Sequence, residues 1–328
     1  MQSSISAEPV RAAPAAATAV TASGVRKQFG ATVAVADLDL QVEEREIFGL
    51  VGPDGAGKTT TFRLLLGLLR PDAGSIRLAG YDIGREPQAA RAVTGYVAQQ
   101  FSLYGDLSID ENIRFAAEIR GVERPVYGER ARQLLEMTDL LPFTARLARD
   151  LSGGMRRKLA LICALIHAPR VLLLDEPTTG VDPVSRREFW RLLYQLPEMG
   201  VSLLISTPYL DEAERCHELG FMSGGRLLAV DTPIGFLGRM PDSVAEIRTP
   251  ARTQAWRWLK ECPAVSWVDT AGSALRVAFD AEAPGMTDGH ALREGLAAAG
   301  MVVESCAPVA PRLSDVFTSL AQAGGDEA

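Results

Sequence analysis

Residues 52–59 constrain the fold of this chain more than any other segment. They read GPDGAGKT, fit the pattern G-x-x-x-x-G-K-[ST], and stand between the apolar run 46–51 (EIFGLV) and the leucine-rich segment 59–69. Because a strand, a glycine-rich loop and a helix in this order are the setting in which the pattern binds phosphate, an ordinary glycine-rich turn is disfavoured. The sequence therefore predicts a phosphate-binding loop in an α/β fold.

The residue types of this loop suit a nucleotide. Glycines let successive backbone N–H groups turn toward one anion, and the helix that begins near Lys58 adds the positive end of its dipole. Lys58 is expected to reach the β- and γ-phosphates, and Thr59 to place a hydroxyl on Mg²⁺. The expected nucleotide ligands here are Gly52, Pro53, Asp54, Gly55, Ala56, Gly57, Lys58, Thr59 and Thr60.

A second segment predicts the carboxylates that such a loop needs at the end of a neighbouring strand. Residues 171–174 read VLLL and are followed directly by Asp175 and Glu176. Four consecutive apolar residues are typical of a strand covered on both faces, so we expect a central strand. Asp175 is predicted to hold the metal, and Glu176 to activate a water. Two plain surface acids are the alternative, which the apolar run disfavours.

The composition of the chain limits the kinds of partner that it is expected to bind. The chain has 328 residues, 34 lysines and arginines against 41 aspartates and glutamates, and a net charge of −7. A mildly acidic chain without a long basic run is a poor general nucleic-acid binder. The short basic run 156–158 (RRK) is predicted to be a solvated helix face. With 47% hydrophobic residues, the chain is expected to bury a sizeable core.

The sequence also predicts a compartment. Its four cysteines form no CxxC pair, which argues against a zinc ribbon or a disulfide scaffold and fits a reducing cytosol. No apolar run approaches the roughly 18 residues that span a bilayer. Residues 1–19 are expected to be a disordered leader, since they lack the apolar core of a signal peptide.

Local patterns predict further elements. Strands are expected at 20–25, 38–42, 201–206, 265–268 and 275–279, and a strand pair around Gly224 and Gly225. Ser108 and Glu111 form a capping box that opens a helix over 109–120. Further helices are expected at 130–138, from the residue after Gly154 to His167, at 211–219 and at 288–299, the last with Asp288 as N-cap.

The segment 151–155 (LSGGM) resembles the signature motif of ATP-binding cassette (ABC) ATPases. The order of the other parts agrees: Phe29 before the loop, Gln99 after GYVAQ, then LSGGM, VLLLDE and the segment 179–182 (TGVD). The resemblance covers roughly residues 20–240. It is strongest to ATPase subunits of bacterial drug exporters of the daunorubicin-resistance type.

The resemblance implies a fold. It is an α/β P-loop NTPase cassette with a mixed sheet core, an antiparallel β-subdomain and a helical subdomain at about 101–168. The cassette would occupy residues 20–240, and residues 241–328 would form a small α+β accessory domain.

The resemblance also implies roles. Phe29 would stack on adenine, and Gln99 would sense the γ-phosphate and Mg²⁺, so that Glu176, Gln99 and Lys58 form the catalytic set. Ser152, Gly153 and Gly154 would contact ATP bound to a second cassette, with Asp182 along that interface. Metal ligands would be Thr59, Gln99 and Asp175.

The implied assembly is an exporter. A second cassette would complete a homodimer or heterodimer, and separate transmembrane permease subunits would dock on residues 101–150. The chain would then lie peripherally on the cytoplasmic face of the membrane, coupling ATP hydrolysis to export.

The sequence departs from the family at one site. The family usually carries histidine in a context such as STHxxDEA, whereas residues 206–213 read STPYLDEA, with Pro208 in the histidine position. Proline has no N–H and cannot donate to the γ-phosphate. We therefore expect this subunit to bind ATP but hydrolyse it slowly, or to pair with a different cassette that supplies a complete site.

Two other functions remain open from the sequence. One is an ABC-type ATPase of translation or DNA repair, which generally has tandem cassettes or a long coiled-coil insertion. Only 94 positions separate Lys58 from Ser152, with no heptad run between them. The other is a nucleotide-dependent regulator that scarcely hydrolyses ATP, against which Glu176 argues.

Overall fold

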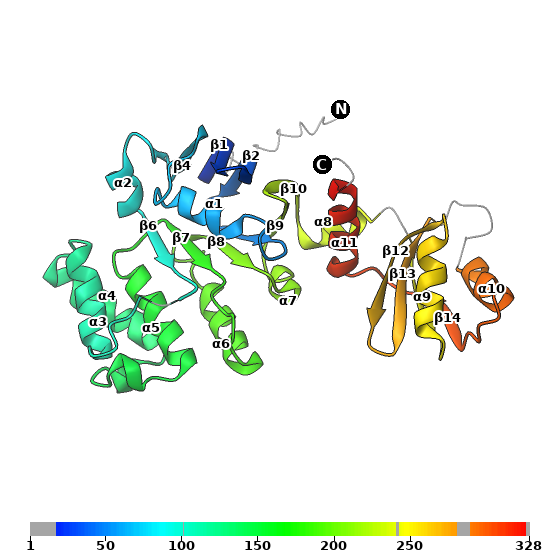
Figure 1. Cartoon of the computed structure of the whole chain (residues 1–328). Helices are drawn as coiled ribbons and strands as arrows, with labels where there is room; N and C mark the ends of the chain where they lie inside the picture. The colour runs from blue at the N-terminus through cyan, green and yellow to red at the C-terminus, as the bar shows by residue number, and fades with distance from the viewer. Residues whose placement is uncertain (1–17, 101, 241–242, 281–288, 326–328) are drawn as a thin grey trace, which may run out of the picture.

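The computed structural model describes residues 18–100, 102–240, 243–280 and 289–325 (Figure 1). The leader predicted over 1–19 therefore lies outside the described residues, except for Thr18 and Ala19, which already belong to the first strand. The strands are β1 (Thr18–Phe29), β2 (Thr32–Glu43), β3 (Ile47–Val51), β4 (Ala73–Leu78), β5 (Tyr81–Asp82), β6 (Thr94–Val97), β7 (Val171–Asp175), β8 (Ser202–Thr207), β9 (Glu218–Ser223), β10 (Arg226–Asp231), β11 (Ser243–Arg248), β12 (Val265–Ala271), β13 (Ala274–Phe279) and β14 (Ser305–Pro308). The helices are α1 (Lys58–Leu65), α2 (Pro87–Ala92), α3 (Ile109–Ile119), α4 (Arg124–Met137), α5 (Gly153–Leu165), α6 (Pro183–Leu193), α7 (Leu210–Ala213), α8 (Pro233–Gly238), α9 (Arg252–Glu261), α10 (His290–Ala298), α11 (Leu313–Gly325) and the 3₁₀ turns η1 (Leu141–Phe143) and η2 (Ala148–Asp150).

A six-stranded sheet in the order β10-β9-β3-β8-β7-β6 forms the centre of the cassette. Strands β9, β3, β8, β7 and β6 run parallel, and β10 pairs antiparallel with β9. Every residue of β3, β7 and β8 is buried. The prediction that VLLLD is a strand paired on both sides and covered on both faces is confirmed.

Successive side chains along the central strands point to opposite faces of the sheet, so they belong to two separate hydrophobic cores. Leu173 packs with β1, β2 and α1 on one face, whereas Leu172 and Leu174 pack with α3, α5 and α6 on the other. The first face carries the antiparallel sheet β2-β1-β4-β5. Figure 1 shows helices α3 to α6 on the side of the central sheet away from β1 and β2. The mixed sheet, antiparallel sheet and helical layer of the predicted fold are all present.

The helical layer begins as predicted. The Ser108 side chain accepts a hydrogen bond from the Glu111 backbone N–H (3.2 Å), and the Glu111 carboxylate accepts one from the Ser108 backbone (2.8 Å). This capping box satisfies N–H groups that the first turn of α3 leaves unpaired. Helix α4 starts six residues earlier than the predicted 130, at Arg124, with Pro125 in its first turn.

The helix predicted at 211–219 is wrong beyond its first turn. Helix α7 ends at Ala213, and Glu218 begins β9, which pairs parallel with β3. Leu219 and Phe221 are buried side chains of this strand. Their spacing of two residues is that of one face of a strand, and β3 offers this segment a partner for parallel pairing. The strand pair around Gly224 and Gly225 is confirmed as β9 and β10.

The remaining residues form a small α+β unit. Its antiparallel sheet has the order β12-β13-β11-β14, and α9 and α10 share a core with it. The predicted N-cap Asp288 lies outside the described residues; Gly289 caps α10 with a φ of 77°. This confirms the α+β character predicted for the region.

Helix α11 leaves that unit and packs on the cassette (Figure 1). The Phe317 ring stacks on Phe221 of β9, with centroids 4.4 Å apart, and meets Phe236 of α8 edge-on at 5.4 Å. A buried ion pair between Arg276 of β13 and Asp315 (2.7 Å) ties α11 back to the small sheet. Helix α11 therefore joins the two cores.

Candidate nucleotide site

The loop between β3 and α1 fits so tightly under its neighbours that side chains are excluded at two positions. A Cβ on Gly52 would lie 2.0 Å from the backbone oxygen of Met222, and one on Gly57 would lie 2.4 Å from that of Ala34. Gly57 also has a φ of 103°, in the left-handed region that favours glycine. Packing therefore requires glycine at 52 and 57, two of the three glycines predicted for phosphate binding.

Lys58 is a buried cation bonded only to neutral groups. Its ammonium donates to the backbone oxygens of Gly52 (2.7 Å) and Pro53 (2.9 Å), and the residue is 5% exposed. Burial lowers the pKa of Lys58, and the charges of Glu176 and other nearby carboxylates oppose that shift. Among the described residues, none forms an ion pair with it. A buried ammonium without a directly bonded anion is unfavourable, so this site suits an incoming phosphate.

The two adjacent carboxylates at the end of β7 face different surroundings. Asp175 is 2% exposed and accepts a hydrogen bond from the Ser206 hydroxyl of β8 (2.5 Å). Glu176 is bonded by Gln99 Nε2 (2.9 Å) and by the Thr179 hydroxyl (3.2 Å). Its φ of 45° is uncommon for a residue with a side chain, and strain of this kind concentrates at functional sites. Asp175 is thus buried in the sheet, whereas Glu176 is only half-buried.

One cleft of about 950 Å³ brings most of the predicted residues together. It joins the phosphate loop to the ends of β7 and β8 and to the β9–β10 turn. Its lining residues are Thr32, Val33, Ala34, Asp54, Gly55, Ala56, Gly57, Lys58, Thr59, Thr60, Gln99, Glu176, Thr179, Pro208, Tyr209, Gly224 and Gly225. Gly52, Pro53 and Asp175 do not line it.

Phe29 lies at the end of β1, near the cleft but outside its lining. It pairs with Thr32, which does line the cleft, and it is 48% exposed. The ammonium of Lys27 lies 5.5 Å from the centre of its ring. The ring is therefore an open aromatic surface beside the cleft.

The signature residues lie at a different place. Ser152 caps α5 by accepting from the Met155 N–H (3.3 Å), and it lines a separate hollow of about 110 Å³ with Gly154 and Ser185. Asp182 caps α6 by accepting from the N–H groups of Val184 and Ser185, both at 3.0 Å. A hydrogen bond from the Ser185 side chain, together with these backbone bonds, lowers the pKa of Asp182. The N-termini of α5 and α6 thus share a surface outside the cleft of Lys58.

Comparison with known proteins settles the family. The family described as ABC transporter matches residues 35–179. The chain is 40% identical over 216 residues to a daunorubicin resistance ATP-binding protein of Streptomyces coeruleorubidus, covering 66% of this chain and 68% of that protein. The chain belongs to the ABC transporter ATP-binding family.

Two further comparisons bear on this cassette. It is 40% identical over 311 residues to a probable multidrug ABC transporter ATP-binding protein of Escherichia coli (strain K12), which covers 93% of this chain. The chain spans about half of that relative's length, 52%. A solved ATP binding subunit of an ABC transporter superposes with a TM-score of 0.62 at 28% identity, covering 68% of this chain and 93% of that one.

The cassette offers donors for Mg²⁺ without a preformed cage. Within residues 18–100, 102–240, 243–280 and 289–325, no three His, Cys, Asp or Glu side chains are grouped to hold a metal. Mg²⁺ typically takes one or two protein oxygens together with waters and substrate phosphates. The Thr59 hydroxyl in the cleft and the Asp175 carboxylate, oriented by Ser206, fit that requirement.

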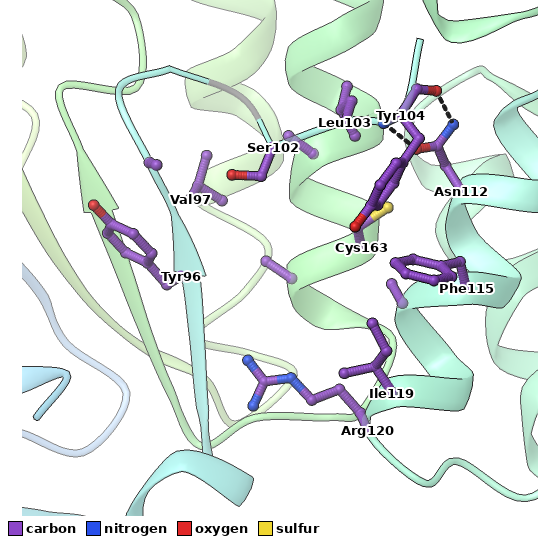
Figure 2. A pocket seen from close by; sticks show the side chains of 14 residues that line it. Tyr96, Val97, Ser102, Leu103, Tyr104, Asn112, Phe115, Ile119, Arg120 and Cys163 are labelled. Carbon is purple, nitrogen blue, oxygen red and sulfur yellow. Dashed lines mark hydrogen bonds between the residues drawn. The ribbon is translucent and has the colours of Figure 1, made fainter. Parts of the chain in front are cut away.

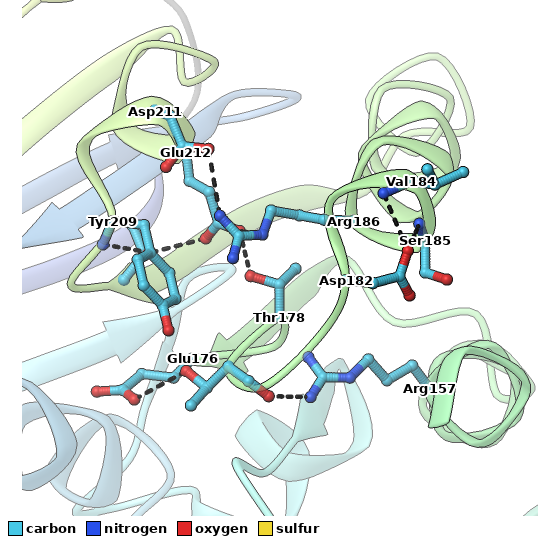
Figure 3. Close-up of polar contacts among 12 residues, drawn as sticks. Arg157, Glu176, Thr178, Asp182, Val184, Ser185, Arg186, Tyr209, Asp211 and Glu212 are labelled. Carbon is cyan, nitrogen blue, oxygen red and sulfur yellow. Dashed lines mark hydrogen bonds and ion pairs between the residues drawn. The ribbon is translucent and has the colours of Figure 1, made fainter. Parts of the chain in front are cut away.

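Sequence reasoning missed a buried polar network beside the cleft, drawn in Figure 3. The Glu212 carboxylate is fully buried and accepts from the hydroxyls of Thr178 and Thr207, the latter at 2.7 Å. Arg186 of α6 pairs with Glu212 at 3.6 Å. The acid at 212 is part of the quoted STPYLDEA segment, but nothing local in the sequence marks it as buried.

The solvated face predicted for the basic run is wrong for Arg157. Arg157 is 7% exposed and donates to the backbone oxygen of Thr179 at 2.5 Å. Burial lowers its pKa to about 10. A sequence signal exists, because Arg157 stands four residues before Leu161 and eight before Leu165, on the apolar face of α5.

A further cavity of about 270 Å³ lies between β6, α3 and α5 (Figure 2). Tyr104 meets Phe115 edge-on at 4.6 Å, and the Asn112 side chain holds the Tyr104 backbone by bonds of 2.9 and 3.1 Å. Tyr104 and Ile119 at its edge are 52% and 66% exposed.

In the described ranges, no helix combines the length and apolarity needed to cross a membrane.

Proposed function

We propose that this chain is the ATP-binding and ATP-hydrolysing subunit of an export complex, in which paired cassettes drive transport through separate membrane subunits. The observation that carries the proposal is the cleft itself. It places a buried ammonium that has no ionic partner, Lys58, together with an acid oriented by an amide, Glu176 bonded to Gln99. That combination suits binding a triphosphate and activating a water.

The binding step follows from the loop. Backbone N–H groups of the glycine-rich segment and the N-terminus of α1 would hold the phosphates, and Lys58 would exchange its carbonyl partners for phosphate oxygens. Thr59 and Asp175 would hold Mg²⁺, with Gln99 adjoining. When bound, the metal supplies positive charge against the γ-phosphate. Phe29 would present its open face to the adenine ring.

The hydrolytic step rests on Glu176. Its carboxylate is already restrained by Gln99 and Thr179, so it can accept a proton from a water without first being ordered. Its left-handed backbone turns the side chain into the cleft, while Asp175 remains in the sheet.

A second cassette would complete the site. Ser152, Gly153, Gly154 and Asp182 lie at helix N-termini outside the cleft of their own chain. Such termini favour anions, so ATP on a second cassette, identical or different, is a fitting partner.

The membrane subunits would dock beside the helical layer. The cavity between β6, α3 and α5 has an aromatic rim, with exposed apolar side chains at Tyr104 and Ile119 (Figure 2). A segment of a permease with apolar anchors fits such a hollow. The chain would then lie on the cytoplasmic face of the membrane. Drug export is proposed from the relatives, which are named for multidrug transport and daunorubicin resistance.

Hydrolysis is expected to be slow. Pro208 lines the cleft where the family usually places a histidine, and it offers no donor. Losing one donor to developing charge typically lowers the rate about 10²–10³-fold.

Glu176→Gln tests the proposal. A transport ATPase should keep ATP binding, lose phosphate release and lose export from cells that also produce the permease. A nucleotide-dependent regulator would keep its biological activity in the same variant. Failure of the wild-type chain to bind ATP with Mg²⁺ would refute the proposal.

A further inference from the structure

We infer that the Tyr209 phenol supplies a hydrogen bond to the γ-phosphate, one residue beyond the proline that cannot make it. The inference rests on the proposed function, since it concerns the same cleft. It assigns to Tyr209 a direct contact with the nucleotide.

Tyr209 is in the right place. It lines the cleft together with Lys58, Glu176 and Pro208, and it is partly buried. Its backbone is bonded, but within the described part of the chain the phenol hydroxyl has no hydrogen-bond partner. A partly buried tyrosine hydroxyl usually finds a partner, so a free one in a polar cleft is available to a ligand.

The turn that carries Tyr209 is fixed. Its N–H donates to the Thr207 hydroxyl (3.1 Å), and that hydroxyl donates to the buried Glu212 carboxylate (2.7 Å). Proline at 208 restricts the backbone between them. The backbone that carries the Tyr209 ring therefore has a fixed position at the end of β8.

The ring itself is held on one face. The Arg186 guanidinium lies 4.5 Å from its centre, a favourable cation–π contact, and Arg186 is in turn paired with Asp211 (3.2 Å) and Glu212 (3.6 Å). In Figure 3 the ring extends from the turn with its hydroxyl directed toward the side where Glu176 lies. The Tyr209 side chain therefore loses little conformational freedom when a ligand binds.

The Tyr209 hydroxyl would donate a hydrogen bond to the γ-phosphate without transferring its proton. A phenol donates one hydrogen bond and a phosphoryl oxygen accepts it, whereas proline has nothing to donate. Because ADP lacks the γ-phosphate, the same bond favours ATP over ADP before any hydrolysis occurs. Tyr209 would thus contribute both to nucleotide preference and to the remaining turnover.

Tyr209→Phe tests this, because phenylalanine keeps a ring over Arg186 and removes only the hydroxyl. ATP and ADP affinities are measured by equilibrium titration with Mg²⁺ in a Glu176→Gln background, where ATP is not consumed. We expect the ATP-over-ADP preference to fall about tenfold, the scale of one hydrogen bond to a charged group. In otherwise wild-type protein, kcat should fall about 10²-fold. Tyr209→His, which retains a ring N–H, should keep most of the preference.

Tyr194→Phe is the matched control. The Tyr194 hydroxyl donates to the Arg215 backbone oxygen (3.3 Å) outside the cleft, so its loss should change neither nucleotide affinity nor kcat. An unchanged ATP-over-ADP preference and an unchanged kcat in Tyr209→Phe, with wild-type ATP turnover intact, would overturn this inference alone. Wild-type protein that binds no ATP would overturn the proposed function as well.

Discussion

Arg157 donates to the backbone oxygen of Thr179, and the hydroxyl of the same Thr179 donates to Glu176. One threonine therefore connects the helix that begins at the signature with the acid that faces the cleft. In the proposed dimer, the N-terminus of α5 contacts nucleotide on the second chain. Movement of α5 would then reach Glu176 through two hydrogen bonds.

Arg157→Gln should weaken this connection. Removing one partner of a buried hydrogen bond lowers the free energy of unfolding by about 1–3 kcal/mol, and Glu176 should lose part of its orientation. We expect kcat for ATP hydrolysis to fall more than ATP affinity. Urea unfolding and steady-state kinetics measure both. Arg156→Gln, at the exposed neighbouring position, is the control and should change neither. Equal effects of the two substitutions would contradict the role of Arg157.

Lys58→Met should separate binding from stability. Methionine retains an unbranched side chain of four atoms but removes the ammonium, so the affinity for ATP should fall about tenfold or more. Without nucleotide, the variant should be no less stable than wild type, since it no longer buries a cation without an ionic partner. Isothermal titration and urea unfolding check the two expectations.

The same variant gives a pH test. Because burial lowers the folded pKa of Lys58 below 10.5, the unfolded chain binds more protons between that lowered value and 10.5. The stability of wild type relative to Lys58→Met should therefore rise as pH increases through this window. A stability difference independent of pH would show that burial does not shift this lysine.

Pro208→His should raise turnover. An imidazole at this position would add a donor to the γ-phosphate, and we expect kcat to increase by up to about 10²-fold. Phosphate release under saturating ATP measures it. If the wild-type rate already equals that of relatives with histidine, and the substitution leaves it unchanged, slow hydrolysis is refuted.

Gly153→Asp should prevent dimer formation without harming the fold. A side chain fits there, since a Cβ on Gly153 meets nothing within 4 Å, and an acid at a helix N-terminus stabilises the helix. The carboxylate would repel ATP on a second chain. In a Glu176→Gln background, we expect ATP binding to persist and the ATP-dependent dimer to disappear in light scattering. Gly128→Asp on α4, where space is also open, should leave the dimer intact.

Phe317→Ala should destabilise the cassette. The ring is 6% exposed and contacts Phe221 and Phe236, and loss of a buried phenylalanine typically lowers the free energy of unfolding by about 3–5 kcal/mol. Val302→Ala, at a position 66% exposed, should change it by less than about 0.5 kcal/mol. Comparable urea midpoints in the two variants would show that α11 contributes little to the cassette.

The parts of the site predicted from sequence are those whose signals are local. The phosphate loop follows a buried strand and opens a helix, and the acids at 175 and 176 come directly after VLLL. Helix α6 was not predicted, although it also has a local signal. Asp182 is its N-cap and Pro183 its first residue, a pair typical of a helix start.

The parts that were missed depend on distant contacts. Glu212 is buried by residues of β7, β8 and α6, and β9 is a strand because β3 offers it an edge. No pattern near residue 317 indicates that its ring stacks on residue 221. Such pairings are set by tertiary packing, which overrides local preference.

The stacking of Phe317 on β9 has a consequence for biosynthesis. Residues 47 and 317 belong to one core, and Phe221 directly precedes Met222, whose carbonyl lies over Gly52. During translation, the nucleotide loop emerges from the ribosome long before Phe317, whose ring packs against the strand β9 that covers this loop. The nascent cassette therefore lacks this aromatic contact until nearly a hundred residues beyond Phe221 have been made, and during that interval Phe221 and Phe236 are not yet covered by Phe317.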